Sequence, residues 1–303
     1  MTENTTRKIN YEDLIKAGVH FGHQTARWCP KMAPYIWGYK NNVHLIDISK
    51  TANQLEKASK FIASVVADGK SVLWIGTKKA AQEIIKNTAN QLEMPYVNHR
   101  WIGGTLSNHP QVRKSVTKLL HFEDIISKSE KHPLYTKKEF TVFQKMVDRL
   151  QKNVGGIINL HWPLGAIVIV DVSKERSALK EAVAVGIPVV AIVDTNGDPS
   201  LVDYVIPAND DAPRSIKIIL DHLAHAAQSG KAVAAAQGKE KPVAPARPTA
   251  PAMDESVALV LNSAEEEDEE GVAKRKAATA EESKRKAVKK TTSVEDEEGV
   301  ATK

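Results

Sequence analysis

Two irregular stretches of the chain pair arginine with tryptophan, a combination suited to binding nucleic acid. Arg27 directly precedes Trp28, and Arg100 directly precedes Trp101. Guanidinium groups bind phosphate, and aromatic rings stack on unpaired bases. We therefore expect these stretches, with neighbouring polar side chains, to contact RNA; the alternative for the tryptophans is that they anchor two loops to the protein body. The candidate RNA-binding residues are Arg27, Trp28, Lys31, Lys78, Lys79, Arg100, Trp101, Asn108, Arg113, Lys114 and Lys118.

A second candidate site combines one histidine with two aspartates. His20 lies near the first predicted helix, and Asp194 and Asp210 each follow an apolar segment. Imidazole and carboxylate groups together suit zinc or a similar ion. The alternative is that Asp210 or Asp211 caps the helix that begins near Pro213. We expect no cofactor, with a single divalent ion at His20, Asp194 and Asp210 as the open alternative.

Common catalytic motifs are absent from the chain. It contains no glycine-rich dinucleotide or P-loop motif, no nucleophile elbow and no H-E-x-x-H zinc motif. The segment most similar to a phosphate-binding motif is the turn at residues 76–79. There, a glycine and two lysines follow a predicted strand and precede a predicted helix. We expect no enzymatic activity. The alternative is an α/β enzyme that binds a phosphorylated small molecule at this turn.

Alternating apolar and amphipathic segments indicate the elements that position these residues. The candidate strands at residues 166–171 and 189–194 are continuous apolar runs, as expected for strands that are apolar on both faces. Helices are predicted between strands, with Ser49 and Ser173 as expected caps and Gly186 as an expected end. This pattern predicts an α/β fold with a parallel sheet covered by helices on both faces. The predicted strands span residues 43–48, 71–75, 96–97, 166–171, 189–194 and 204–206, and the last predicted helix spans residues 213–228.

One segment interrupts the alternation of strands and helices. Residues 106–152 contain two helical stripes separated by a turn region, which predicts an inserted antiparallel helical hairpin. The sheet domain is expected to comprise residues 1–105 and 153–230. The remaining residues, 231–303, contain no aromatic side chain and repeat short charged strings. They predict a disordered low-complexity tail.

Charge and composition narrow the class of protein. The 303 residues carry a net charge of +5, while residues 231–303 contain 13 basic and 15 acidic residues. The excess positive charge therefore lies in the rest of the chain, which favours an anionic partner. A single cysteine, Cys29, excludes an intrachain disulfide. The apolar runs are too short to cross a bilayer, and the first residues lack the apolar stretch of a secretion signal, so we expect an intracellular protein.

Several motifs closely resemble the bacterial type of small-subunit ribosomal protein number two. They occur in register between Tyr11 and Gly230 and read GVHFGHQT, PKMAPYIWG, GTKKAAQE, NHRWIGGTLSN, GIPVVAIVDTN and DPSLVDYVIPANDDAPRSI. The resemblance implies a flavodoxin-like (Rossmann-like) parallel sheet flanked by helices, with an inserted coiled-coil hairpin, and no catalysis. The chain departs from the family's usual residues at Cys29, Gly165 and Val172, where the family usually has Asn, Asp and Pro.

The same resemblance implies the function and the partners. It implies a structural constituent of the small ribosomal subunit, located in cytoplasmic ribosomes between the head and body of the subunit, that binds rRNA and supports translation. It also implies contact with neighbouring small-subunit proteins, including the large mRNA-binding protein number one, and no DNA or membrane partner. A third interpretation, which the residues leave open, is a scaffold that docks proteins through the helical hairpin and barely touches nucleic acid.

Overall fold

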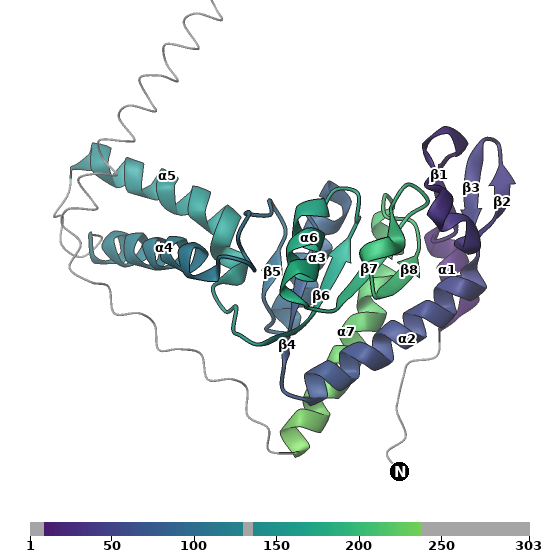
Figure 1. The fold of residues 1–303 in the computed structure, drawn as a ribbon. Helices are drawn as coiled ribbons and strands as arrows, with labels where there is room; N and C mark the ends of the chain where they lie inside the picture. The colour runs from purple at the N-terminus through teal and green to yellow at the C-terminus, as the bar shows by residue number, and fades with distance from the viewer. Residues whose placement is uncertain (1–8, 130–135, 238–303) are drawn as a thin grey trace, which may run out of the picture. The chain divides into compact units, whose positions relative to one another are not determined.

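The computed structural model describes residues 9–129 and 136–237, which are drawn in colour in Figure 1. These residues belong to two units. The first unit holds the described residues up to Ile125 and from Met146 onward, and the second holds those between Ile126 and Lys145. Most of the predicted tail, from residue 238 onward, lies outside the described residues. The predicted disorder of that segment therefore stays a prediction.

A five-stranded parallel sheet forms the centre of the first unit, as the continuous apolar segments predicted. Its strand order is β5-β4-β6-β7-β8, and every neighbouring pair is parallel. This is the flavodoxin-like order, in which the direction of winding reverses between the first and third strands in sequence, here β4 and β6. The strands are β4 (Ser71–Ile75), β5 (Tyr96–Val97), β6 (Leu164–Val170), β7 (Val189–Val193) and β8 (Tyr204–Pro207).

Helices cover both faces of this sheet because alternate strand residues point to opposite sides. Trp74 and Val168 belong to one buried core, whereas Leu73 and Ile167 belong to the other. The first core is covered by helices that include α2 and α7, which lie side by side (Figure 1). Its helices are α1 (Tyr11–Ala17), α2 (Ile48–Ala67), α3 (Lys79–Gln91) and α7 (Pro213–Ala236). The second core is covered by α6 (Arg176–Val185) and by parts of two further helices.

A second, antiparallel sheet lies N-terminal to the parallel one in sequence. It has the order β1-β3-β2 and consists of β1 (Phe21–Gln24), β2 (Ile36–Lys40) and β3 (Val43–Ile46). The expectation that residues 43–48 belong to the parallel sheet was therefore wrong. Asn41 and Asn42 both have positive φ, which suits the two-residue hairpin turn between β2 and β3. Trp37 lies in β2.

Two helices occupy the segment predicted to be an inserted hairpin, namely α4 (His109–Ser129) and α5 (Lys137–Val154). In the first unit, Val116 and Leu119 of α4 are buried in the second core, and Leu150 of α5 packs against it. In the second unit, Thr136 and Glu139 form a capping box at the start of α5: the Thr136 N–H donates to Glu139 Oε2 at 2.8 Å, and the Glu139 N–H donates to Thr136 Oγ1 at 3.4 Å. The exact division of the chain into domains stays a prediction.

Helix ends differ from expectation in three places. Asp47, rather than Ser49, caps α2 with its carboxylate. Residue Glu175 precedes α6 without a side-chain cap, so the prediction for Ser173 was wrong, whereas Gly186 ends that helix with φ 77° as predicted. Helix α7 continues past Gly230 to Ala236. Short 3₁₀ helices complete the described elements: η1 (Thr25–Arg27), η2 (Pro30–Tyr35), η3 (Gly155–Ile157) and η4 (Pro199–Leu201).

Candidate nucleic-acid interface

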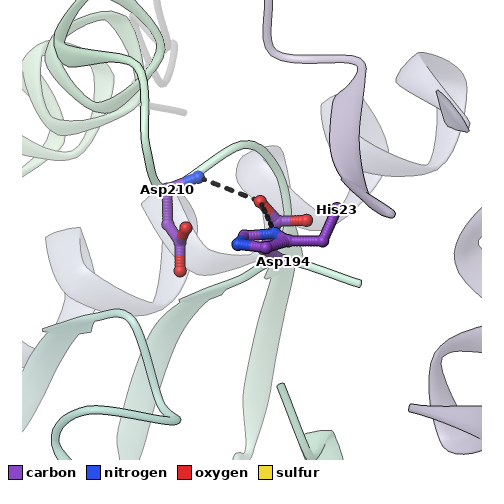
Figure 2. Close-up of side chains that lie close together, drawn as sticks. All are labelled: His23, Asp194 and Asp210. Atoms are coloured by element: carbon purple, nitrogen blue, oxygen red, sulfur yellow. Dashed lines mark hydrogen bonds and ion pairs between the residues drawn. The ribbon is translucent and has the colours of Figure 1, made fainter. Parts of the chain in front are cut away.

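The carboxyl edge of the parallel sheet carries an acidic cluster that includes one histidine (Figure 2). Asp194 directly follows β7, Asp210 follows β8, and His23 comes from β1. His23 Nδ1 lies 3.0 Å from Asp194 Oδ2, and the backbone N–H of Asp210 donates to the same oxygen at 3.5 Å. One ligand atom from each of the three residues lies within 4.8 Å of the others. The geometry therefore brings together the donor types that a divalent cation prefers.

The histidine of this cluster is His23 and not His20, which corrects the set proposed from sequence. The His20 ring packs on the neighbouring Phe21 ring, with centroids 4.1 Å apart. Strand β1 approaches the loop after β7 closely at Gly22, where an added Cβ would lie 2.6 Å from a methyl carbon of Thr195. The His23 N–H donates to Thr195 Oγ1 at 2.9 Å. This approach, which only glycine permits, carries the His23 ring to Asp194.

Lys78 lies inside the acidic cluster. Its Nζ is 2.6 Å from Asp211 Oδ1, 2.7 Å from Asp210 Oδ1 and 3.5 Å from Asp171 Oδ2. Burial disfavours the charged amine, but hydrogen bonds to Asp210 and Asp211 outweigh burial and raise the pKa of Lys78. Its charge is already paired, so the structure gives no support to the expectation that Lys78 binds an RNA phosphate.

The cluster holds more negative than positive charge. Burial, together with the nearby charges of Asp171 and Asp194, raises the pKa of Asp210 to about 7 despite the ion pair with Lys78. The hydrogen bond with Asp194 raises the pKa of His23. Asp210 is 1% exposed, and its Oδ2 has no hydrogen-bond partner among the residues that the structure describes. An unsatisfied buried carboxylate oxygen is costly, and a cation would satisfy it.

The turn at residues 76–79, the alternative phosphate site, is occupied by a side chain of the protein itself. The Thr77 N–H donates to Glu175 Oε1 at 3.1 Å, and the Thr77 hydroxyl donates to the same oxygen. Glu175 is 3% exposed, and Lys174 Nζ donates to the Thr77 carbonyl oxygen at 2.9 Å. The Glu175 carboxylate therefore takes the place that a phosphate would need at the start of α3. This arrangement weighs against an enzyme that binds a phosphorylated small molecule there.

The loop of residues 98–108, between β5 and α4, is attached to α6 through Glu181. Trp101 Nε1 donates to Glu181 Oε1 at 3.1 Å, and Trp101 packs against the second core. Trp101 therefore anchors the loop to the protein body, which was the alternative to RNA stacking that the sequence left open for the tryptophans. Burial opposes ionisation of Glu181, but hydrogen bonds from the loop outweigh it and lower the pKa of this carboxyl group. Glu181 was not among the predicted residues, because its partners lie more than 70 positions away and no local sequence feature marks such a glutamate.

The remaining basic candidates, together with Asn108, are exposed on several elements of the first unit. They lie in η1 and η2, at the start of α3, in the 98–108 loop and on α4; the exposed candidates are Arg27, Lys31, Lys79, Arg100, Asn108, Arg113, Lys114 and Lys118. Lys31 forms a surface ion pair with Asp198 at 2.8 Å. Trp28 is partly exposed, with its ring centroid 5.2 Å from that of His44. These side chains are accessible to an anionic partner.

Two aromatic residues of β2 are also exposed, and the sequence analysis did not select them. Trp37 is 77% exposed and Tyr39 is 73% exposed. They are two residues apart on one strand, and the register of β2 with β3 shifts between Ile36 and Gly38, next to Trp37. Large exposed aromatic side chains are typical of surfaces that contact other macromolecules.

Comparisons with known proteins place the chain in a family. Among the described helices, none combines the length and the apolar character needed to span a membrane. A family model described as ribosomal protein S2 matches residues 14–230. The small ribosomal subunit protein uS2 of Cytophaga hutchinsonii is 49% identical over 213 residues, which cover 70% of this chain and 84% of that protein.

Two further relatives, also small ribosomal subunit proteins uS2, match the chain over similar lengths. The small ribosomal subunit protein uS2 of Roseiflexus castenholzii is 46% identical over 231 residues, which cover 76% of this chain and 88% of that protein. The corresponding protein of Hahella chejuensis is 42% identical over 235 residues, with coverage of 77% and 92%. With this match over most of its length, the chain belongs to the ribosomal protein S2 family.

Proposed function

We propose that this chain is a structural constituent of the small ribosomal subunit, which binds rRNA and supports translation in cytoplasmic ribosomes. The match to the S2 family along residues 14–230 carries the proposal. The family is one of ribosomal structural proteins and not of enzymes. The Glu175 carboxylate at the Thr77 turn agrees with a non-catalytic role, since it fills the place where a phosphorylated substrate would bind.

Electrostatic anchoring is the proposed mechanism. The exposed cations come from elements distant in sequence, and such phosphate contacts position a protein on RNA without reading bases. We assign this role to the exposed candidates, with Trp28 as an aromatic contact. Lys78 and Trp101 are left out because their polar groups are bound within the protein, to the acidic cluster and to Glu181.

Partners other than rRNA are the neighbouring small-subunit proteins. The resemblance names the mRNA-binding protein number one among them, and we propose that contact for this chain. What supports a protein contact is the exposure of Trp37 and Tyr39 on β2, because aromatic side chains are enriched at protein interfaces.

A single divalent cation at the acidic cluster is the second part of the proposal. His23, Asp194 and Asp210 would hold it, and the unpartnered Oδ2 of Asp210 supports this assignment. One imidazole and two carboxylates form a donor set that suits zinc. The ion would neutralise the excess negative charge and join β1 to the loops that follow β7 and β8.

Reversing the charge of Arg100 tests the proposed RNA contact. We expect Arg100→Glu to lower the affinity for small subunits that lack this protein by at least about tenfold, because a charge-assisted hydrogen bond is lost. The side chain is exposed, so the melting temperature should stay unchanged. The measurement is co-sedimentation of the variant with such subunits in a gradient.

Lys57→Glu is the matched control, since it makes the same charge change at an exposed position of α2. This control should still enter the subunit. Normal incorporation of Arg100→Glu would remove Arg100 from the interface. A wild-type protein that never sediments with ribosomal subunits would overturn the proposed function as a whole.

A further inference from the structure

We propose that Glu181 is the positioning residue of the 98–108 loop, and that its carboxylate acts on rRNA binding by holding Arg100 in place. The inference rests on the proposed function and adds to it a residue that does not itself touch RNA. Glu181 lies on α6, whereas the loop connects β5 to α4. The two segments are far apart in sequence and meet at this side chain.

The Glu181 carboxylate accepts hydrogen bonds from four residues of the loop. Its Oε1 accepts from Trp101 Nε1 at 3.1 Å and from the Gly104 N–H at 2.9 Å. Its Oε2 accepts from the Leu106 N–H at 3.1 Å and from both the N–H and the hydroxyl of Ser107 at 3.4 Å. Both oxygens are used, and three of the donors are backbone groups. One side chain therefore determines the path of the loop from residue 101 to residue 107.

The loop needs an external anchor because its own sequence favours mobility. Gly103 and Gly104 are adjacent, and Gly104 adopts φ 91°, a conformation that glycine adopts readily. Glycines lose more conformational entropy on ordering than other residues do. Within the loop, the Asn108 N–H donates to the Gly104 carbonyl at 2.8 Å. The Thr105 N–H also donates to the Ile102 carbonyl oxygen at 3.2 Å, and these two turns leave the N–H groups of Leu106 and Ser107 to Glu181.

The anchored residues flank the residues proposed to contact RNA. Trp101, bound to Oε1, directly follows Arg100, and Ser107, bound to Oε2, directly precedes Asn108. Arg100 and Asn108 are both exposed. An arginine held in a defined place loses less entropy when it binds a phosphate, which is the usual advantage of preorganisation.

Charge alone predicts the opposite effect, which makes the inference testable. Glu181 is anionic and lies against a loop proposed to bind a polyanion, so neutralising it should strengthen RNA binding if only long-range electrostatics matter. Positioning predicts weaker binding after the same substitution. Glu181→Gln removes the charge with little change in size, and it replaces one acceptor oxygen by an amide that faces N–H donors.

The experiment compares Glu181→Gln with Glu83→Gln in binding to small subunits that lack this protein. Glu83 is exposed on α3, so its substitution changes the net charge equally without touching the loop. We expect the dissociation constant to rise about tenfold for Glu181→Gln, as for loss of one charged contact, and to stay the same or fall for Glu83→Gln. Equal or tighter binding by Glu181→Gln would overturn the inference.

A double-mutant cycle tests whether Glu181 acts through Arg100. Arg100→Ala should weaken binding about tenfold in the wild-type protein but only slightly in the Glu181→Gln background. A structural role without positioning would leave the two effects additive, and additivity would overturn the inference. Trp101→Phe keeps the aromatic packing and removes one donor to Glu181, so it provides a second variant if Glu181→Gln does not fold; we expect about threefold weaker binding at an unchanged melting temperature.

Failure of this inference is distinguishable from failure of the proposed function. Wild-type protein that binds the depleted subunits while Glu181→Gln and Trp101→Phe bind equally well would refute the positioning role alone. Wild-type protein that does not bind them at all would refute both.

Discussion

His23 and His20 show how strongly the role of a single residue depends on partners that are distant in sequence. His20 immediately precedes β1 and was part of the predicted ion site, whereas His23 lies within β1, three positions further along the chain. Only His23 reaches Asp194, because Gly22 lets β1 approach Thr195. A bulkier residue at position 22 would separate the imidazole from the carboxylates.

Zinc binding by the acidic cluster is the prediction at this scale. We expect Zn²⁺ to bind the protein at pH 8, measured by titration calorimetry, and His23→Ala to abolish the binding. Binding should weaken between pH 8 and pH 6, because the pKa of Asp210 is about 7, the pKa of His23 is raised, and both must lose their protons to ligate a metal.

His20→Ala is the control for that measurement, because His20 packs on Phe21 outside the cluster. It should bind Zn²⁺ like the wild type. Absence of binding at pH 8, or equal losses in the two histidine variants, would contradict the assignment of the site.

The local sequence pattern predicted helices and strands correctly where their ends do not depend on contacts with distant elements. The continuous apolar runs at β6 and β7 are buried on both faces, and they were predicted correctly as strands of a parallel sheet. Helix α7 was expected to end before Gly230, because glycine usually weakens a helix. The helix continues because Gly230 packs directly on α2, where an added Cβ would lie 2.6 Å from the Ala63 carbonyl oxygen.

Gly230→Ala is the prediction at the scale of the element. Alanine favours an exposed helix over glycine by about 1 kcal/mol, but overpacking a tight contact costs about 1–3 kcal/mol. Because the contact is with backbone atoms, we expect the cost to dominate and the melting temperature to fall by a few degrees. Thermal unfolding monitored by circular dichroism measures the change.

Gln228→Ala provides the comparison on the same helix, because Gln228 is exposed. It should melt at or above the wild-type temperature. A Gly230→Ala variant as stable as Gln228→Ala would show that α2 and α7 are not held at the observed separation.

The whole molecule combines a basic body with a more acidic C-terminal segment. Residues 231–303 contain 13 basic and 15 acidic residues, while the complete chain has a net charge of +5. A flavodoxin-like sheet usually offers a ligand site at its carboxyl edge. Here Glu175 and Lys78 are bound to other residues at that edge, whereas the exposed cations lie on loops and helix surfaces.

Salt dependence is the prediction at the scale of the whole molecule. If about six phosphates are neutralised on binding, affinity for small subunits that lack this protein should fall about a thousandfold between 50 and 200 mM salt. The dissociation constant measured across this range gives the slope. A change of less than about threefold would exclude anchoring by phosphate contacts and would favour docking through protein surfaces, such as the exposed Trp37 and Tyr39 of β2.

The order of residues along the chain was sufficient to predict the strands of the parallel sheet, the two helices between β5 and β6, and the family. These features depend on local periodicity and on contiguous motifs, both of which can be read from neighbouring residues in the sequence. The second sheet, the choice of His23, the pairing of Lys78 and the anchoring by Glu181 required the folded chain. In the last three cases the interacting atoms come from positions between 74 and 188 apart in the sequence. Side-chain partners at such separations leave no periodic signal in the sequence.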